Sequence, residues 1–219
     1  MGLDMYLNKF PRTSYFTLEE LQVIISKHKS QIRDGLPLSF SDTNFTQEQQ
    51  DAARKLIENA GVSFYDWDDG HQFPQSSLQS EVGYWRKANA VHDFFVQTVQ
   101  GGVDDCDYHD EVTREVLEEL RDRCQRIIES TVMVNSKIRN GMHYDFESNT
   151  WQEILEDGRV VINPEVCDAE LPTQSGFFFG STDYDEYYME DITYTYELCE
   201  RLLKEIDFDN NMLFYISSW

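Results

Sequence analysis

Acidic side chains are concentrated in the second half of this chain, and they restrict which of its faces can be buried. Residues 101–219 hold 28 Asp and Glu against 9 Lys and Arg, which accounts for −19 of the overall net charge of −23. A surface of one sign repels nucleic acid and anionic lipid, and it attracts cations or basic proteins. The charge therefore predicts a basic protein surface as a partner, no direct nucleic-acid binding and no membrane contact.

The aromatic content of this acidic chain is higher than is typical of acidic disordered chains. The sequence has 14 Phe, 12 Tyr and 4 Trp among 219 residues, which is enough to build a core. No apolar run is long enough to cross a bilayer, so we expect a cytoplasmic protein. The four cysteines form no C-x-x-C pair and are expected to be reduced and buried.

Helices are predicted in five places from capping signals and apolar spacing. Two capping boxes, Thr17 with Glu20 and Thr46 with Gln49, start helices that end before glycines at 35 and 61. A third helix is predicted over 80–100 and a fourth over about 110–130. The fifth is expected to follow a turn at 181–183.

Strands are predicted where apolar residues alternate or cluster between turn signals. Residues 3–7 alternate, residues 213–216 are similarly β-prone, and 62–67 and 176–180 read as further strands. Residues 130–170 read as a partly irregular connection. Together these patterns predict a single α+β domain over 1–219, with amphipathic helices packed on a small sheet in which the N- and C-terminal strands are candidates for pairing.

The turn Gly180-Ser181-Thr182-Asp183 is the first candidate site. A glycine-flanked strand that leads into a helix leaves backbone N–H groups free to bind an anion. The acids that follow it fit two alternatives, a helix cap or a site for Mg²⁺ or Ca²⁺ that includes Asp183 and Asp185. No certain cofactor follows from these residues.

A second acidic cluster, Asp104, Asp105 and Asp107, follows a glycine pair. It is a candidate cation site, although its spacing matches no EF-hand, and the interpretation that the sequence favours is a solvated acidic loop. A third cluster at 66–71 has the same two interpretations.

The predicted helix over 80–100 carries Trp85, Arg86, Asn89 and His92 on neighbouring turns. These side chains could stack on and neutralise a planar anion such as a nucleotide. For His92, the alternative is a hydrogen-bonded core histidine.

Several segments resemble an uncharacterised family of small acidic proteins that are encoded by bacteriophages and prophages. They are the opening GLDMYL, the central EVGYWRKANAVHDFFV, and the block GFFFGSTDYDEYY that begins at residue 176. The resemblance implies a phage or prophage origin, and hence the host cytoplasm, but it supplies no activity and no catalytic residues.

Two functions follow from these features. The first is a phage accessory protein whose acidic surface binds a basic, nucleic-acid-binding protein of the host or phage, as a nucleic-acid mimic or counter-defence inhibitor. The alternative is a small enzyme or ligand-binding protein for a nucleotide or phosphorylated metabolite, with Mg²⁺ as a candidate cofactor. The sequence decides neither whether the protein is an enzyme nor its oligomeric state. A pocket in which polar groups converge would favour the alternative.

Overall fold

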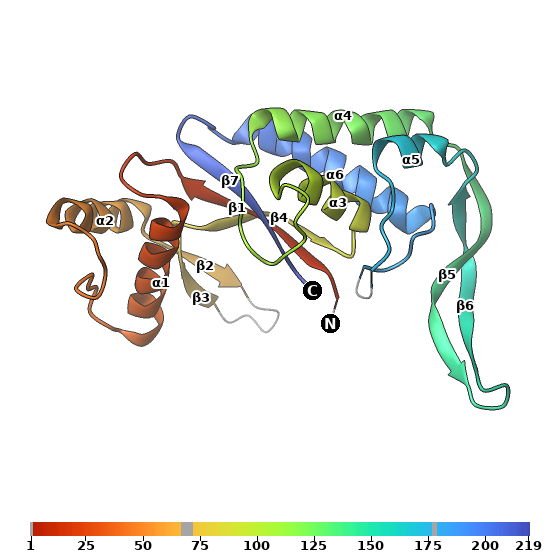
Figure 1. The fold of residues 1–219 in the computed structure, drawn as a ribbon, viewed down its shortest axis with the longest axis horizontal. Helices are drawn as coiled ribbons and strands as arrows, with labels where there is room; N and C mark the ends of the chain where they lie inside the picture. Colours follow the sequence, from red (N-terminus) through yellow and green to blue (C-terminus); the bar gives the residue numbers. More distant parts are fainter. Residues whose placement is uncertain (1, 67–71, 177–178) are drawn as a thin grey trace. The chain divides into compact units, whose positions relative to one another are not determined.

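The computed structural model describes residues 2–66, 72–176 and 179–219. Its helices and strands make a mixed α+β fold, as the sequence predicts (Figure 1). Contacts divide the chain into two units, one made of 1–7, 82–206 and 213–219 and the other of 8–81 and 207–212. The sequence carries no signal for this division, and a single domain over 1–219 stays a prediction.

A three-stranded sheet joins both ends of the chain. It consists of β1 (Asp4–Pro11), β4 (Ser80–Arg86) and β7 (Asn211–Ser218) in the order β4-β1-β7. The predicted pairing of the N- and C-terminal strands is therefore confirmed. The alternating residues Leu3, Met5 and Leu7 are fully buried, as their period indicates.

The helix predicted over 80–100 is wrong in its first half. Residues 80–86 form strand β4, and only Asn89–Val99 form a helix, α3. In β4, Gly83 and Trp85 are buried while Tyr84 and Arg86 are exposed, which is the two-residue period of a strand. The helix was predicted over 80–86 as well because Trp85 lies at helical spacing from the apolar residues of α3.

Two long helices pack against each other beside this sheet. They are α4 (Arg114–Ser130), capped by Thr113, and α6 (Glu186–Glu205), and the short α5 (Glu165–Glu170) contacts α4 (Figure 1). Trp85 of β4 donates its Nε1–H to Thr195 Oγ1 of α6 at 2.9 Å. The predicted helices over 110–130 and after 184 are confirmed.

The expected irregular connection over 130–170 is wrong. Strands β5 (Met133–Asp145) and β6 (Thr150–Val161) form a long antiparallel hairpin that extends away from α4 and α6 (Figure 1). Its glycines and polar residues read as turn signals, but Gly158 faces Ile138 so closely that an added Cβ would lie 2.5 Å from Ile138 Cδ1. The glycine is required for close packing, not for a turn.

The described residues of the predicted strand over 176–180 do not form a strand. Phe177 and Phe178 lie outside the described residues, and Phe179 donates its N–H to the Gly176 carbonyl in a turn at 3.2 Å. Residues 172–176 and 179–185 instead belong to loop segments that precede α6. Among these described residues, the turn that was expected to bind an anion is therefore not preceded by a strand.

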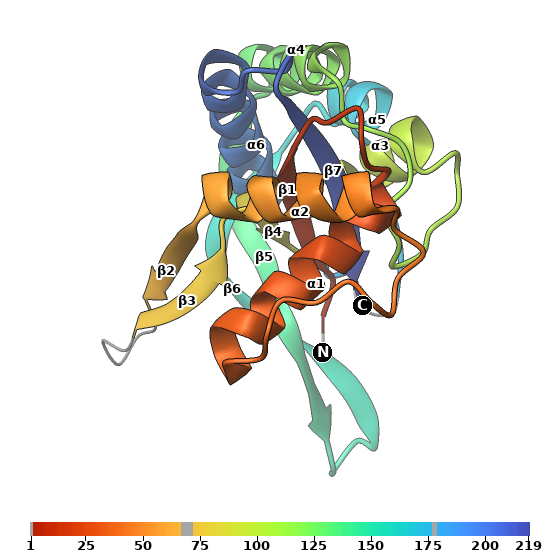
Figure 2. The same cartoon turned by 90° about the vertical axis from the view of Figure 1, so that its left-hand side faces the viewer.

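The second unit holds two helices and a small hairpin. Helices α1 (Leu18–Asp34) and α2 (Gln47–Ala60) have the predicted capping boxes and end before glycines, and they lie next to one another in both views (Figure 2). Strand β2 (Val62–Asp66) pairs with β3 (Gln72–Ser76), which contacts α1.

The four cysteines are free thiols. Cys124, Cys167 and Cys199 are buried as predicted, whereas Cys106 is exposed. Within the described part of the chain, the length and hydropathy needed to cross a bilayer are not met by any helix.

Candidate functional site

A strained turn connects β4 to α3. Lys87 has a φ of 62°, in the left-handed region that favours glycine. Ala88 follows with φ −75° and ψ 70°, and the N–H of Asn89 returns to the Lys87 carbonyl at 2.8 Å. A lysine in this conformation costs about 1 kcal/mol, and such outliers cluster at functional sites.

This turn leaves the N-terminus of α3 open. Ala88 stands at the cap position and provides no side-chain hydrogen bond. Among the described residues, the backbone N–H groups of Ala90 and Val91 have no acceptor. Free N–H groups in the first turn of a helix are a ready site for an anion.

Asn89 ties the first turn of α3 to the loop that precedes α6. Its Nδ2 donates to the carbonyls of Phe179 at 2.9 Å and Ser181 at 2.8 Å, and its Oδ1 accepts the N–H of Gln174 at 2.9 Å. The side chain is 5% exposed and uses both donors and its acceptor. Asn89 is therefore a positioning residue, which holds this loop against α3.

A pocket of about 670 Å³ lies where these segments meet, within the first unit. This volume is in the range of about 300–1,000 Å³ that is usual for small-molecule sites. The pocket is lined by the β4–α3 turn with the start of α3, residues 139–142 of β5, the loop before α6, and the first turns of α6. Its charged lining residues are Arg86, Lys87, Arg139, Asp183, Asp185, Glu190 and Asp191.

Strand β5 contributes Arg139 at an irregular point of the hairpin. The pairing register shifts between Arg139 and Met142, and Gly141 has a φ of 115°. Arg139 donates to Ser181 Oγ at 3.1 Å and pairs with Asp183 at 3.4 Å. Such a bulge re-aims side chains, and here the residues around it line the pocket.

Asp185 caps α6, which is one of the two roles that the sequence suggested for the acids after the turn. Its Oδ1 accepts the N–H groups of Tyr187 at 3.0 Å and Tyr188 at 3.1 Å. Its Oδ2 is buried and has no hydrogen-bond partner among the residues that the structure describes, and Asp185 is 1% exposed. Burial raises the pKa of this carboxyl, and the two N–H donors oppose that effect.

Asp191 lies one to two turns further along α6 and lines the same pocket. Burial, with repulsion from Glu190 and Asp185, raises its pKa to about 7. No hydrogen bond from the described residues reaches its carboxylate. A carboxyl that titrates near neutrality in a pocket is a functional-site signal.

The structure brings together only part of the ligand-binding set suggested by the sequence. Arg86, Asn89, Gly180, Ser181 and Asp183 all line the pocket. The others lie elsewhere. Trp85, on β4, is in the core against α6, and Thr182 lines a neighbouring hollow with Lys137 and Pro164.

His92 is a hydrogen-bonded core residue, as the alternative interpretation held. It is 1% exposed, and its two ring nitrogens lie 2.7 Å from Tyr215 Oη and 3.1 Å from Asp104 Oδ1. The His92 ring also packs edge-on against the Phe179 ring, with 5.0 Å between the ring centroids. His92 therefore contacts the loop that precedes α6 but does not line the pocket.

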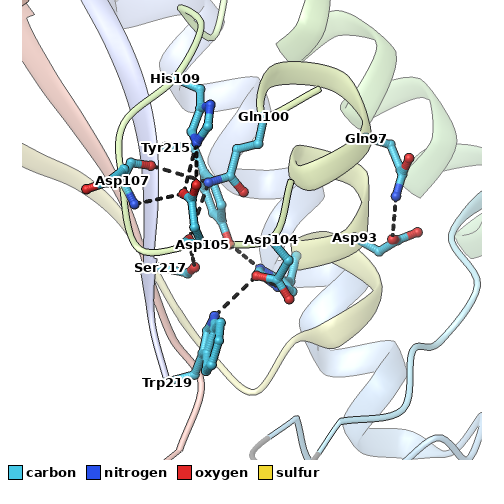
Figure 3. Close-up of polar contacts among 11 residues, drawn as sticks. Asp93, Gln97, Gln100, Asp104, Asp105, Asp107, His109, Tyr215, Ser217 and Trp219 are labelled. Atoms are coloured by element: carbon cyan, nitrogen blue, oxygen red, sulfur yellow. Dashed lines mark hydrogen bonds and ion pairs between the residues drawn. The ribbon is translucent and has the colours of Figure 1, made fainter. Parts of the chain in front are cut away.

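The cluster Asp104, Asp105 and Asp107 uses two of its carboxylates within its own unit (Figure 3). Asp104 accepts from His92 and Trp219, and Asp105 accepts from His109 and from the backbone of Asp107. The bond from Trp219 and a bond from Ser217 Oγ to the Asp105 carbonyl fasten the loop after α3 to the end of β7. The third cluster, at 66–71, falls on residues whose side chains are not described.

Across residues 2–66, 72–176 and 179–219, no group of three or more His, Cys, Asp and Glu side chains is arranged to hold a metal ion. Asp183 and Asp185, the other proposed cation ligands, are instead engaged with Arg139 and with the first turn of α6. Neither acidic cluster therefore gives a recognisable cation site.

No protein-family model, curated protein or solved structure matches this chain. The site rests on its geometry alone. Sequence reasoning missed Lys87, Arg139 and Asp191, which no motif marks. The one available signal was the acid at 191 on the inner side of a predicted helix, close to the apolar Tyr188 and Ile192.

Proposed function

We propose that this protein binds a small phosphorylated metabolite or nucleotide, with the phosphate at the N-terminus of α3. The observation that carries the proposal is that the N–H groups of Ala90 and Val91, which have no acceptor among the described residues, lie in a pocket that Lys87 also lines. Backbone donors at a helix start and a lysine point charge are the usual elements of a phosphate site.

The cations in the pocket differ in how far they are already neutralised. Arg86 pairs with Asp4 at 2.8 Å, and Arg139 pairs with Asp183 at 3.4 Å and Glu153 at 3.6 Å. Among the described residues, no carboxylate pairs with Lys87, which is exposed. Lys87 is therefore the cation with charge to offer an incoming anion.

The expectation of an acidic surface that binds a basic protein stays a prediction. Several acids of α4 and α6 are already partnered within the same unit: Arg121 pairs with Asp122 of α4 and Glu200 of α6, and Arg123 pairs with Glu119 of α4. Arg126 pairs likewise with Glu170. Because these carboxylates are already paired, they are less suited to imitate the unpaired phosphates of a nucleic acid. The pocket therefore supports ligand binding better than the acidic surface supports nucleic-acid mimicry.

Calorimetric titration with AMP, GMP, glucose 6-phosphate and glucosamine 6-phosphate tests the proposal. We expect at least one of them to bind with a Kd below about 1 mM, and Lys87→Ala to weaken that binding about tenfold or more. The matched control is Lys204→Ala, which removes an exposed lysine near the end of α6, outside the pocket. Absence of binding by all four compounds, or equal loss in both variants, would overturn the proposal.

A further inference from the structure

We propose that the ligand carries an amino or amidine group as well as its phosphate, and that Asp185 and Asp191 accept the N–H donors of that group. The inference rests on the proposed function and deepens it. It assigns different roles to two parts of the pocket lining, with the anion bound at the start of α3 and the N–H donors of the ligand bound at the start of α6.

The strongest observation is the unpartnered oxygen of Asp185. Oδ1 is used by the helix cap, so the orientation of the carboxyl group is fixed and Oδ2 is held where it is. A buried acceptor without a donor is costly, because it has lost water and gained nothing in exchange. Since Asp185 lines the pocket, a ligand that places an N–H there would remove this cost.

Asp191 adds a second acceptor on the same helix. It also lines the pocket and receives no hydrogen bond from the described residues. Asp191 and Asp185 line the same pocket. Two acceptors in one pocket suit a ligand with two or more N–H donors, such as an ammonium or an amidine group.

Among the described residues, no cationic side chain pairs with Asp185 or Asp191. Arg86 bonds Asp4, and Arg139 bonds Ser181, Asp183 and Glu153. A bare metal ion is also a poor fit, because no three candidate ligands among the described side chains converge. The missing donor is therefore expected to be an organic N–H group of the ligand.

Two pairs of compounds test the inference, because the members of each pair differ in one amino group. Glucosamine 6-phosphate is compared with glucose 6-phosphate, which tests a sugar ammonium. GMP is compared with IMP, which tests the amidine edge of a nucleobase. We expect the amino-bearing member of one pair to bind about tenfold more tightly than its partner, as a charge-assisted hydrogen bond would give.

Asp185→Asn is the decisive variant. Asparagine is also a good helix cap, so Oδ1 can still accept from α6, while a donor replaces the unpartnered Oδ2. We expect the preference for the amino-bearing compound to fall to within about threefold. The matched control, Glu197→Gln, neutralises an exposed acid of α6 outside the pocket and should keep the preference. If Asp185→Asn does not fold, Asp191→Asn carries the same test.

The outcomes separate the two proposals. Equal binding within both pairs would overturn the inference and leave phosphate binding intact. A preference that survives both Asp185→Asn and Asp191→Asn would also overturn it. Failure of these four compounds and of AMP to bind would overturn the proposed function itself.

Discussion

Asn89 and Ser181 stand 92 positions apart in the chain and are joined by a hydrogen bond of 2.8 Å from the Asn89 amide to the Ser181 carbonyl. With its bonds to Phe179 and Gln174, this side chain fixes the loop that forms one wall of the pocket. The shape of the pocket therefore depends on one buried amide.

Asn89→Ala should destabilise the protein by about 2–4 kcal/mol, because it leaves buried backbone groups without partners. Urea denaturation followed by circular dichroism measures the change. Gln97→Ala on the same helix, which removes one exposed hydrogen bond to Asp93, should cost about 0.5 kcal/mol or less. Equal effects in the two variants would show that Asn89 does not hold the loop.

Lys87→Gly should stabilise the fold and weaken ligand binding. Glycine adopts a φ of 62° without strain, so we expect a gain of about 1 kcal/mol in the free energy of unfolding. Lys87→Ala is the matched comparison, because it removes the same ammonium group but keeps the Cβ. A melting temperature no higher for the glycine variant than for the alanine variant would mean that the turn is unstrained.

Asp191→Asn should stabilise the protein at pH 8 and have little effect near pH 4. The pKa of Asp191 is raised to about 7 in the folded state, against about 3.9 in an unfolded chain. Between about pH 3.9 and pH 7 the folded state binds more protons at Asp191 than the unfolded state does, so the free energy of unfolding falls as pH rises. Above pH 7 the Asp191 carboxyl is charged in both states, and the destabilisation has reached its full size. Removing the charge should recover on the order of 2 kcal/mol at pH 8.

Thermal melts of the wild type and Asp191→Asn from pH 4 to pH 8 measure this difference. The other charged groups of the pocket remain in both proteins, namely Arg86, Lys87, Arg139, Asp183, Asp185 and Glu190. Glu197→Gln on the exposed side of α6 should give no such pH-dependent gain. A difference that stays constant over this range would contradict the raised pKa.

Gly158→Ala should destabilise the β5–β6 hairpin. The new Cβ would lie 2.5 Å from Ile138 Cδ1, and Ile138 is only 3% exposed and so has little room to move. Such overpacking costs about 1–3 kcal/mol. Ser136, which pairs with Gly158 across the hairpin, is exposed, and Ser136→Ala should change the free energy of unfolding by about 0.5 kcal/mol or less.

The helices that local residues specify were predictable from the sequence. Helices α1 and α2 each start with a capping box, formed by Thr17 with Glu20 and by Thr46 with Gln49. Each box lies within four consecutive residues, so it can be recognised in the sequence without knowledge of any tertiary contact. Strand β4 was missed because its alternation is short and Trp85 also fits a helical stripe. The hairpin was missed because Gly158 serves packing against Ile138, which is distant in sequence.

The candidate site was predictable in part. Asn89, Ser181 and Asp183 were among the ligand-binding residues that the sequence suggested, and they do line one pocket. The open end of α3 could not be foreseen, since it depends on the left-handed backbone of Lys87, which no side-chain pattern encodes. Arg139 reaches Ser181 only through the pairing of β5 with β6, which is a non-local contact.

The order β4-β1-β7 has a consequence for synthesis. Strand β1 is made first, yet one of its two neighbours, β7, lies about two hundred residues later. At about 5–20 residues per second, the ribosome needs roughly 10–40 s to deliver that neighbour. During this interval one edge of β1 is unpaired, so a nascent chain should depend on chaperones or on transient cover of that edge until β7 emerges.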